Sequence, residues 1–221
     1  MTSKRSYGDA CGVARALDAV GERWALMVVR ELLLGPKRFT DIRAGLPSLS
    51  ADVLAQRLRG LEGAGVVRRR TMPPPAASKV YELTPSGEAL EPVILALGRW
   101  GGANAAPPCA GMGMSFDAHV LSMRSLFRPD LAGDFAARIE LRLGEGHFRA
   151  TVAGGSFEID PGEDPAADAT LETDPGTLLA LIHGRRELAE VQRAGEIAIE
   201  GDEAVAARFL GLFPLPEPAV A

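Results

Sequence analysis

The chain has 221 residues, a formal net charge of −5, and 47% hydrophobic and 24% charged residues, which are ordinary proportions for a globular protein. No apolar run reaches the roughly 20 residues that span a bilayer, and the polar start lacks the apolar stretch of a signal peptide. We therefore expect no membrane segment, no wholesale disorder, one large or two small domains, and a place in the cytoplasm.

The charge is divided unevenly along the chain. Residues 1–103 carry 15 Lys and Arg against 10 Asp and Glu, a balance of +5, whereas residues 104–221 carry 9 against 19, a balance of −10. Salt screens charges beyond about 8 Å, so a local basic surface attracts phosphates even on an acidic chain. The asymmetry points to a nucleic-acid-binding part in the first half.

The first half begins with three predicted helices. Apolar residues at helical spacing indicate helices over residues 13–20 and 24–34, and Gly35-Pro36 ends the second one. Thr40 is placed to cap a short helix that ends near Ala44.

A hairpin and a last helix complete this half. The two strands are expected over residues 66–72 and 79–83, with Pro73–Pro75 at the tip because proline cannot donate ladder hydrogen bonds. Thr84 precedes a helix over residues 85–100 that starts with proline, which suits the first helical position.

The composition shifts near residue 101. Residues 101–113 are rich in Gly, Ala and Pro and read as a linker between two packed units. We therefore expect a first domain over residues 1–103, a linker over 104–115 and a second domain over 116–215.

The second half changes its hydrophobic period from that of helices to that of strands. Short stretches alternate apolar and polar residues between glycine turns, and helical patterns follow. The expected strands cover residues 139–143, 148–152, 157–159 and 197–199. One expected helix starts at Asp174-Pro175, and two more cover residues 186–194 and 202–213. The predicted fold class is α+β, with an N-terminal winged helix-turn-helix domain and a C-terminal sheet-and-helix domain.

A helix over residues 51–62 carries the pattern of a DNA-reading element. Ser48 and Ser50 are candidate caps, and at about 100° per residue Leu54, Leu58 and Leu61 share a face that buries the helix. Asp52, Gln56 and Arg59 lie on the opposite face with Ala55 beside them. Gln can bond adenine and Arg can bond guanine bidentately in the major groove, which admits a helix.

Basic residues flank this helix on both sides. Alternation along the first hairpin strand sends Arg68 and Arg70 to one face and Arg69 to the other, whereas Arg57 sits near the apolar side and suits backbone or intramolecular contacts. The residues expected to face DNA are Arg38, Thr40, Arg43, Ser50, Ala51, Asp52, Ala55, Gln56, Arg57, Arg59, Arg68, Arg69, Arg70 and Lys79.

An alternative stands beside this interpretation. A polar helix face and an arginine-bearing strand are often simply solvated, and winged helices also serve as protein-interaction modules. The patterns alone favour DNA binding only modestly.

The first half resembles the HxlR family of bacterial regulators. The stretches that carry the resemblance are CGVARALDAVGERW (11–24), RELLLGPKRFTDIR (30–43), LAQRLRGLEGAGVVR (54–68) and VYELTPSG (80–87). The resemblance covers residues 11–101 and implies a winged-helix homodimer, paired through its first and last helices, on promoter DNA. The wing is rich in Pro and Ala where a charged tip residue is common in the family.

The two cysteines, Cys11 and Cys109, are too few for a disulfide framework. Some members of the resembled family sense oxidants or electrophiles through a cysteine near the position of Cys11, and Arg15 one turn on could lower its pKa. The alternative is a small buried hydrophobe at the dimer interface. Cys109, in the linker, is expected to be incidental.

The second half resembles the sterol-carrier-protein-type lipid-binding fold over about residues 117–213. The stretches FRATVAGGSFEI (148–159), ADATLETDPGTLL (167–179) and GEIAIEGD (195–202) carry this resemblance. It implies a sheet covered by helices and an apolar cavity for a hydrophobic effector. The residues that could line the cavity, or simply form core, are Leu178, Leu179, Ile182, Phe209, Leu212 and Phe213.

The sequence contains no recognisable motif for catalysis or metal binding. His119, His147 and His183 are scattered, and no spacing suggests a metal site. No nucleophile elbow, phosphate loop or dinucleotide fingerprint occurs. We expect no metal, no cofactor and no enzyme. The predicted function is a sequence-specific DNA-binding regulator that can respond to a hydrophobic ligand, and the alternatives are a thiol-based sensor or a lipid-carrier or interaction protein without DNA binding.

Overall fold

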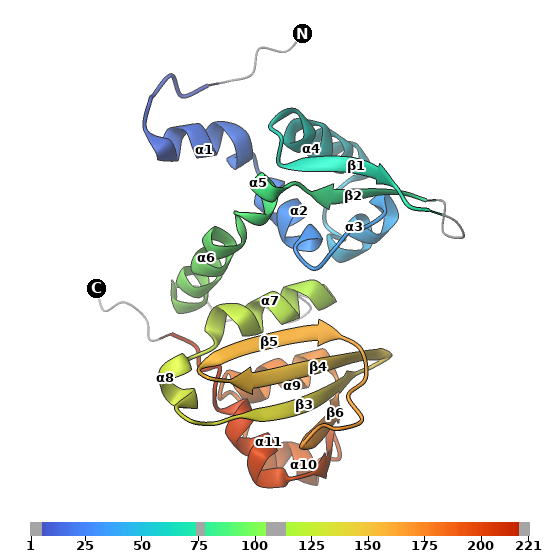
Figure 1. Cartoon of the computed structure of the whole chain (residues 1–221), viewed down its shortest axis with the longest axis vertical. Coiled ribbons are helices and arrows are strands. Elements are labelled where there is room, and N and C mark those ends of the chain that lie inside the picture. The colour runs from blue at the N-terminus through green and yellow to red at the C-terminus, as the bar shows by residue number, and fades with distance from the viewer. Residues whose placement is uncertain (1–5, 74–77, 105–113, 217–221) are drawn as a thin grey trace. The chain divides into compact units, whose positions relative to one another are not determined.

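The computed structural model describes residues 6–73, 78–104 and 114–216 (Figure 1). Within these residues, no helix combines the length and the apolar character that crossing a bilayer requires. The predicted hairpin tip falls partly, and Cys109 falls wholly, outside the described residues.

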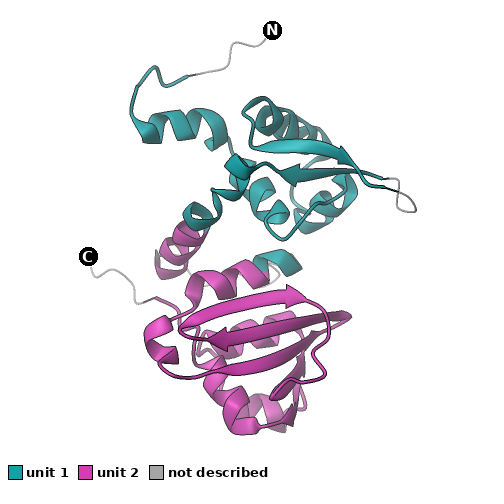
Figure 2. Cartoon of the chain, viewed as in Figure 1, with its two compact units in different colours: residues 1–94, 113–118 teal, residues 95–112, 119–221 magenta. Residues whose placement is uncertain are grey.

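The chain forms two compact units (Figure 2). Unit 1 comprises residues 1–94 and 113–118, and unit 2 comprises residues 95–112 and 119–221. Unit 1 is mainly helical with a two-stranded hairpin, and unit 2 contains a five-stranded sheet with helices. This arrangement confirms the α+β fold class.

Unit 1 has the element order of a winged helix. Its antiparallel hairpin pairs Val67 with Leu83 and Thr71 with Lys79. The elements are α1 (Gly12–Val20), α2 (Ala25–Leu32), α3 (Phe39–Gly45), α4 (Ala51–Gly63), β1 (Val67–Thr71), β2 (Lys79–Leu83), α5 (Pro85–Glu88) and the start of α6 (Glu91–Asn104).

The core of unit 1 holds α4 in place. Leu54, Leu58 and Leu61 are at most 1% exposed, and they pack in one cluster with Val28 and Ile42. Burying a leucine side chain contributes about 1.5–3 kcal/mol, so these three side chains fix which face of α4 points inward.

Two predicted helix boundaries in unit 1 are wrong. The short helix α3 begins at Phe39, so Thr40 lies inside its first turn, and the backbone N of Arg38 donates instead to Asp41 Oδ2 at 3.2 Å. The helix expected over 85–100 is two helices, α5 and α6, and α6 runs on to Asn104.

Gly87, inside α5, lies against the residue that precedes β1. A Cβ on this residue would stand 2.2 Å from the backbone O of Val66, so the chain passes there with almost no room. Thr84 caps α5 by accepting a hydrogen bond from Gly87 N at 3.2 Å.

Unit 2 is built around a mixed sheet in the order β5-β4-β3-β6-β7, in which β3 and β6 are parallel and the other neighbours antiparallel. The strands are β3 (Ala137–Leu143), β4 (Gly146–Ala153), β5 (Ser156–Pro161), β6 (Ala169–Thr173) and β7 (Ile197–Gly201). The four predicted strands are present, each slightly longer than expected.

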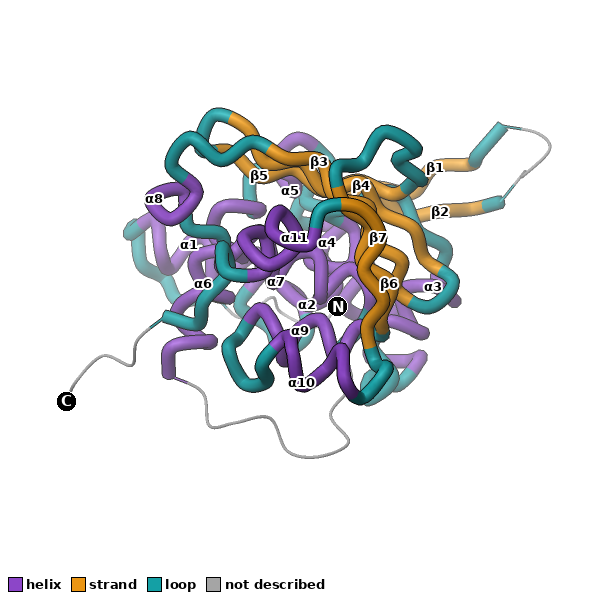
Figure 3. Tube along the Cα trace, turned by 90° about the horizontal axis from the view of Figure 1, so that it is seen from below, coloured by secondary structure: helices purple, strands orange, loops and turns teal. Residues whose placement is uncertain are grey.

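Helices cover this sheet. Helix α11 contacts β3, β6 and β7, and Figure 3 shows α9, α10 and α11 on the same side of the sheet. The helices of unit 2 after α6 are α7 (Phe116–Leu126, whose first turn belongs to unit 1), α8 (Pro129–Ala132), α9 (Pro175–Ile182), α10 (Leu188–Arg193) and α11 (Glu203–Leu210). The sequence reasoning did not predict α7, α8 or β6.

Candidate DNA-binding surface

Helix α4 divides into the two faces that its periodicity predicts. Asp52, Gln56 and Arg59 are exposed, whereas Ala51 and Ala55 are half-buried beside them. The buried leucines hold the polar face outward, so its side chains are available to a groove of DNA.

The N-terminus of α4 is capped by Ser50, one of the two predicted candidates. Its Oγ accepts a hydrogen bond from Val53 N at 3.4 Å, and Asp52 lies in the first turn. The remaining N–H groups of a helix N-terminus favour anions such as phosphate.

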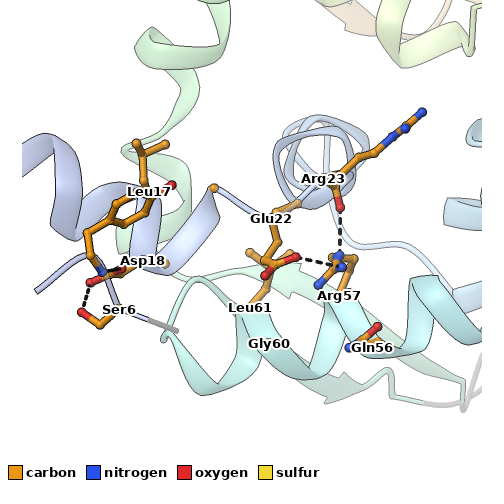
Figure 4. A pocket seen from close by; sticks show the side chains of 13 residues that line it. Ser6, Leu17, Asp18, Glu22, Arg23, Gln56, Arg57, Gly60 and Leu61 are labelled. Atoms are coloured by element: carbon orange, nitrogen blue, oxygen red, sulfur yellow. Dashed lines mark hydrogen bonds and ion pairs between the residues drawn. The ribbon is translucent and has the colours of Figure 1, made fainter. Parts of the chain in front are cut away.

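Arg57 makes intramolecular contacts, as its place near the apolar side indicated. Its Nε donates to the backbone O of Arg23 at 2.8 Å, and Nη2 lies 3.1 Å from Glu22 Oε2 (Figure 4). Next to them Trp24 has φ = 76°, the left-handed region that bulky residues rarely occupy. Arg57 therefore holds the turn between α1 and α2 against α4.

The three wing arginines are exposed but paired with carboxylates. On one face Arg68 Nε and Arg70 Nε lie 2.7 Å and 3.2 Å from the oxygens of Glu82, a carboxylate whose side chain is 9% exposed. On the other face Arg69 Nε lies 2.9 Å from Glu62 Oε1, and its guanidinium sits 5.3 Å from the ring centre of Tyr81. The predicted alternation is present, with acidic partners that the sequence reasoning missed.

The remaining candidates surround α4. Arg38 and Thr40 are exposed at the start of α3, Arg43 is exposed near its end, and Lys79 is exposed at the start of β2. The structure thus brings the candidate residues onto the exposed parts of α3, α4 and the hairpin, and their contact with DNA stays a prediction.

A buried ionic cluster joins α2 to the segment before α3 and to Ser115. Glu31 is fully buried, and its oxygens lie 2.7 Å from Arg30 Nη2, 3.1 Å from Lys37 Nζ and 2.6 Å from Ser115 Oγ. Lys37 also pairs with Asp117. Burial alone raises the pKa of Glu31, but the bonds from Ser115 and Arg30 and the charge of Lys37 outweigh it and lower that pKa.

Lys37 also fixes the hairpin. Its backbone N donates to Tyr81 O at 3.0 Å, and Tyr81 N donates to Lys37 O at 2.8 Å. The segment before α3 is therefore joined to β2 by two main-chain hydrogen bonds. Sequence reasoning missed the Glu31 cluster. The signal for it would have been the glutamate itself, which lies on an otherwise apolar helix face.

A cavity of about 830 Å³ lies beside α4 (Figure 4). At one end of it Asp18 accepts hydrogen bonds from Ser6 Oγ at 2.7 Å and from Tyr7 N at 2.9 Å. Its lining also includes Leu17, Glu22, Arg23, Gln56, Arg57, Gly60 and Leu61. Gln56 thus lies both on the exposed face of α4 and at the edge of this cavity.

Cys11 is an exposed free thiol just before α1. Its backbone N donates to Asp9 Oδ1 at 2.8 Å, and its carbonyl accepts the first helical bond from Arg15 N at 3.1 Å. The thiol is accessible in the single chain, and both the sensing interpretation and burial at a dimer interface stay predictions.

Five of the six residues proposed for the effector cavity are buried in this structure, and Leu179 is half-buried. Phe209 and Phe213 are fully buried with ring centres 5.1 Å apart. A cavity of about 300 Å³ nearby is lined by Ile182, His183 and neighbours from α9 and α11. The others of the predicted set, Leu178, Leu179 and Leu212, are buried or half-buried, and their role in binding a ligand stays a prediction.

A helix-turn-helix with an outward polar helix and a basic hairpin defines a winged-helix protein of the DNA-binding class. The model of the HxlR-like helix-turn-helix family matches residues 19–108, and that of the SCP-2 sterol transfer family matches residues 128–214. The chain therefore belongs to the HxlR-like helix-turn-helix family, with an SCP-2-type domain after it.

Two relatives agree with this assignment by sequence. The uncharacterized HTH-type transcriptional regulator YvaP of Bacillus subtilis (strain 168) is 41% identical over 86 residues, which are 39% of this chain and 80% of the relative. The HTH-type transcriptional regulator YodB of the same organism is 35% identical over 85 residues, 38% of this chain and 76% of the relative. The solved reduced form of YodB is 31% identical with a TM-score of 0.40, and it covers 46% of this chain and 100% of its own.

Proposed function

We propose that this protein is a sequence-specific transcription regulator that binds double-stranded DNA as a homodimer in the cytoplasm. The observation that carries the proposal is the exposed face of α4, with Gln56 and Arg59 held outward by three buried leucines. In this arrangement α4 enters the major groove, where Gln and Arg read bases. The relatives are named as regulators, and we propose no catalytic step.

The wing supplies the phosphate contacts. Arg68, Arg69 and Arg70 are between 48% and 61% exposed, and each pairs with a carboxylate in the absence of DNA. Exposed ion pairs contribute little stability. A DNA phosphate can therefore take the place of Glu62 beside Arg69, and phosphates can contact Arg68 and Arg70 while Glu82 stays beside them. Lysine and arginine contacts to phosphates release counterions and make binding fall with salt.

The dimer interface that we propose is apolar and helical. Val93, Leu97 and Trp100 are 47%, 45% and 68% exposed, and their spacing puts them on one stripe of α6. Val13 and Leu17 form a second exposed apolar pair on α1. These are the first and last helices of the domain, through which members of the resembled family pair.

The second domain makes ligand control part of the proposal. A match to the SCP-2 sterol transfer family supports a hydrophobic effector. Such a ligand changes DNA affinity only if it binds the DNA-competent and DNA-incompetent states differently, and DNA then changes the ligand's affinity by the same factor.

The test is a DNA-binding measurement on the full chain with the duplex just upstream of its own gene. We expect saturable binding that weakens with salt, with a slope set by several phosphate contacts, and weaker binding to a scrambled duplex of the same composition. Equal affinity for both duplexes, or none for either, contradicts the proposal and leaves a lipid-carrier or interaction protein.

Thiol sensing through Cys11 is a second candidate function. The observation in its favour is the exposure of this thiol at the start of α1, one of the two helices that we assign to the dimer. Modification of the thiol there would act on DNA binding by disturbing the pairing of the two subunits.

A further inference from the structure

Ser115, which precedes α7, and Asp117, in its first turn, belong to unit 1, whereas the rest of that helix, from His119 on, belongs to unit 2. Both residues lie after residue 108, where the HxlR-like match ends, and before residue 128, where the SCP-2 match begins. Their contacts inside unit 1 are therefore a feature of this chain that neither family match covers.

Ser115 makes two hydrogen bonds with different roles. Its Oγ accepts a bond from Ala118 N at 3.2 Å, which caps α7, and donates to Glu31 Oε1 at 2.6 Å. Glu31 lies on α2 and is fully buried, so no water can replace a donor that its carboxylate loses. The side chain of Ser115 therefore joins the start of α7 to the core of unit 1.

Asp117 pairs with Lys37, the residue whose main chain holds the hairpin. Asp117 is 9% exposed. Burial raises the pKa of its carboxyl, and the hydrogen bond and the charge of Lys37 offset only part of this effect. The charged form of Asp117 thus gains no net stabilisation from its surroundings, so a small change at α7 suffices to weaken the ion pair.

Lys37 connects these contacts to the hairpin. Its ammonium lies 3.1 Å from Glu31 Oε2 and also pairs with Asp117, and its backbone exchanges two hydrogen bonds with Tyr81 in the middle of β2. The guanidinium of Arg69 lies 5.3 Å from the ring centre of Tyr81. Direct contacts therefore lead from the start of α7 to a wing arginine.

We propose that Ser115 and Asp117 form a clasp that holds Lys37, and with it the hairpin, in the position that binds DNA. Both are positioning residues that do not touch DNA. Because α7 continues into unit 2, a change in the second domain that shifts this helix alters the clasp and with it the affinity for DNA. The inference rests on DNA binding and ligand control within the proposed function, and it supplies a physical route for that control.

The first test is DNA binding by two variants of the full chain whose charges change in opposite directions. Ser115→Asp keeps a good helix cap but replaces the donor to Glu31 with a second carboxylate, and Asp117→Asn removes one negative charge. Charge alone would weaken DNA binding in the first variant and strengthen it in the second. The clasp predicts weaker binding in both, by about tenfold and about threefold. Unchanged or tighter binding by Asp117→Asn overturns the proposal.

Ser86→Asp is the matched control for the added charge. Ser86 is exposed in the first turn of α5 in unit 1, so this substitution adds the same charge at the start of another helix. We expect it to weaken DNA binding by less than about twofold, because salt screens an exposed charge. Equal losses for Ser86→Asp and Ser115→Asp overturn the proposal.

Amide hydrogen exchange of the full chain without DNA tests the clasp directly. In both clasp variants the amides of Lys37 and Tyr81, which donate the two main-chain bonds, are expected to exchange about tenfold faster, whereas the amides of β3 in unit 2 keep their wild-type rates. Unchanged exchange at Lys37 and Tyr81 overturns the proposal. This measurement needs no DNA, so it decides the inference even if the wild type binds no duplex, a result that contradicts the proposed function.

Reciprocity tests the connection to the second domain. If α7 acts on DNA binding, then DNA acts on α7 with the same coupling free energy. A saturating duplex is expected to slow amide exchange in Phe116–Leu126 of the wild type by about threefold or more, and Ser115→Asp should abolish this slowing. Helix α9 is the internal control and should keep its rates. Absence of slowing at α7 in a wild type that binds the duplex overturns the proposed route.

Discussion

Glu31 and Gly45 approach each other so closely that a Cβ on Gly45 would stand 2.1 Å from Glu31 Oε2. The carboxylate cannot move aside without loss, because Arg30, Lys37 and Ser115 all bind it. We expect Gly45→Ala to lower the free energy of unfolding by about 1–3 kcal/mol, as overpacking of a buried site does. Urea denaturation followed by circular dichroism measures it.

Gly60 provides the matched control. It also lies in a helix, but a Cβ there has nothing within 4 Å, so Gly60→Ala is expected to leave stability unchanged or raise it by up to about 1 kcal/mol. Similar losses at both glycines would contradict the role of the Glu31 cluster.

Gln56 and the wing arginines are expected to affect DNA binding differently. Gln56→Ala should change sequence preference, with about 1–3 kcal/mol lost at one base position. Arg69→Ala or Arg70→Ala should weaken all duplexes alike and reduce the salt slope by about one. Fluorescence anisotropy on a set of single-base operator variants separates the two effects.

Arg149→Ala serves as the control for charge, because Arg149 is exposed on β4 of unit 2. An equal loss on every duplex for Gln56→Ala would refute a base-reading role. A salt slope that Arg70→Ala leaves unchanged would argue against phosphate contacts by the wing.

Leu97 tests the dimer. Leu97→Asp places a charge in the exposed apolar stripe of α6 and is expected to shift the protein toward monomer, because burying an unpaired charge at an interface is unfavourable. Sedimentation velocity at several concentrations gives the result. Leu131 is the matched control, since it lies on α8 and is 46% exposed, against 45% for Leu97. Dimers that survive Leu97→Asp would place the interface elsewhere.

The lowered pKa of His183 predicts that the stability of the fold depends on pH. Burial, with smaller contributions from Arg185 and His119, lowers its pKa from 6.5 to about 4. Between these values the unfolded chain binds the proton and the folded chain does not, so stability is fully present above pH 6.5 and declines as pH falls toward 4. Melting temperatures from pH 8 to 4 should show this decline, and His183→Leu should reduce it. An unchanged pH profile in the variant would show that other groups cause the decline.

The exposed thiol of Cys11 is expected to react with an alkylating agent in the native protein. If it is a sensor, alkylation lowers DNA affinity in the wild type, and Cys11→Ser removes the response while it preserves DNA binding. Cys109→Ser is the control for the second thiol. An inert Cys11 in the native dimer, shown by mass spectrometry, would remove the sensing function.

Periodicity predicted the faces of α4 correctly because spacing along one helix determines them. The same reasoning could not predict the ion pairs of Glu82, because its pairing with Arg68 and Arg70 depends on the register of β1 against β2. The partnership of Glu31 with Ser115 joins residues 84 positions apart, so no local pattern could show it.

Strand β6 was missed for a related reason. Within Ala169–Thr173, Leu171 is the one large apolar side chain, so alternation is weak. The strand is stabilised by pairing with β3 on one side and β7 on the other, which is a tertiary effect. The proposed effector residues were chosen for their apolar character, which a core and a cavity wall share, so their sequence pattern does not separate the two.

The two main-chain bonds between Lys37 and Tyr81 hold the middle of β2 against the segment just before α3. In the proposed complex a duplex therefore meets a preassembled surface, and the DNA has to bend to correct any mismatch in curvature. Since bending and groove compression depend on base steps, operator choice should extend to positions that no side chain touches, with flexible pyrimidine–purine steps preferred between the half-sites.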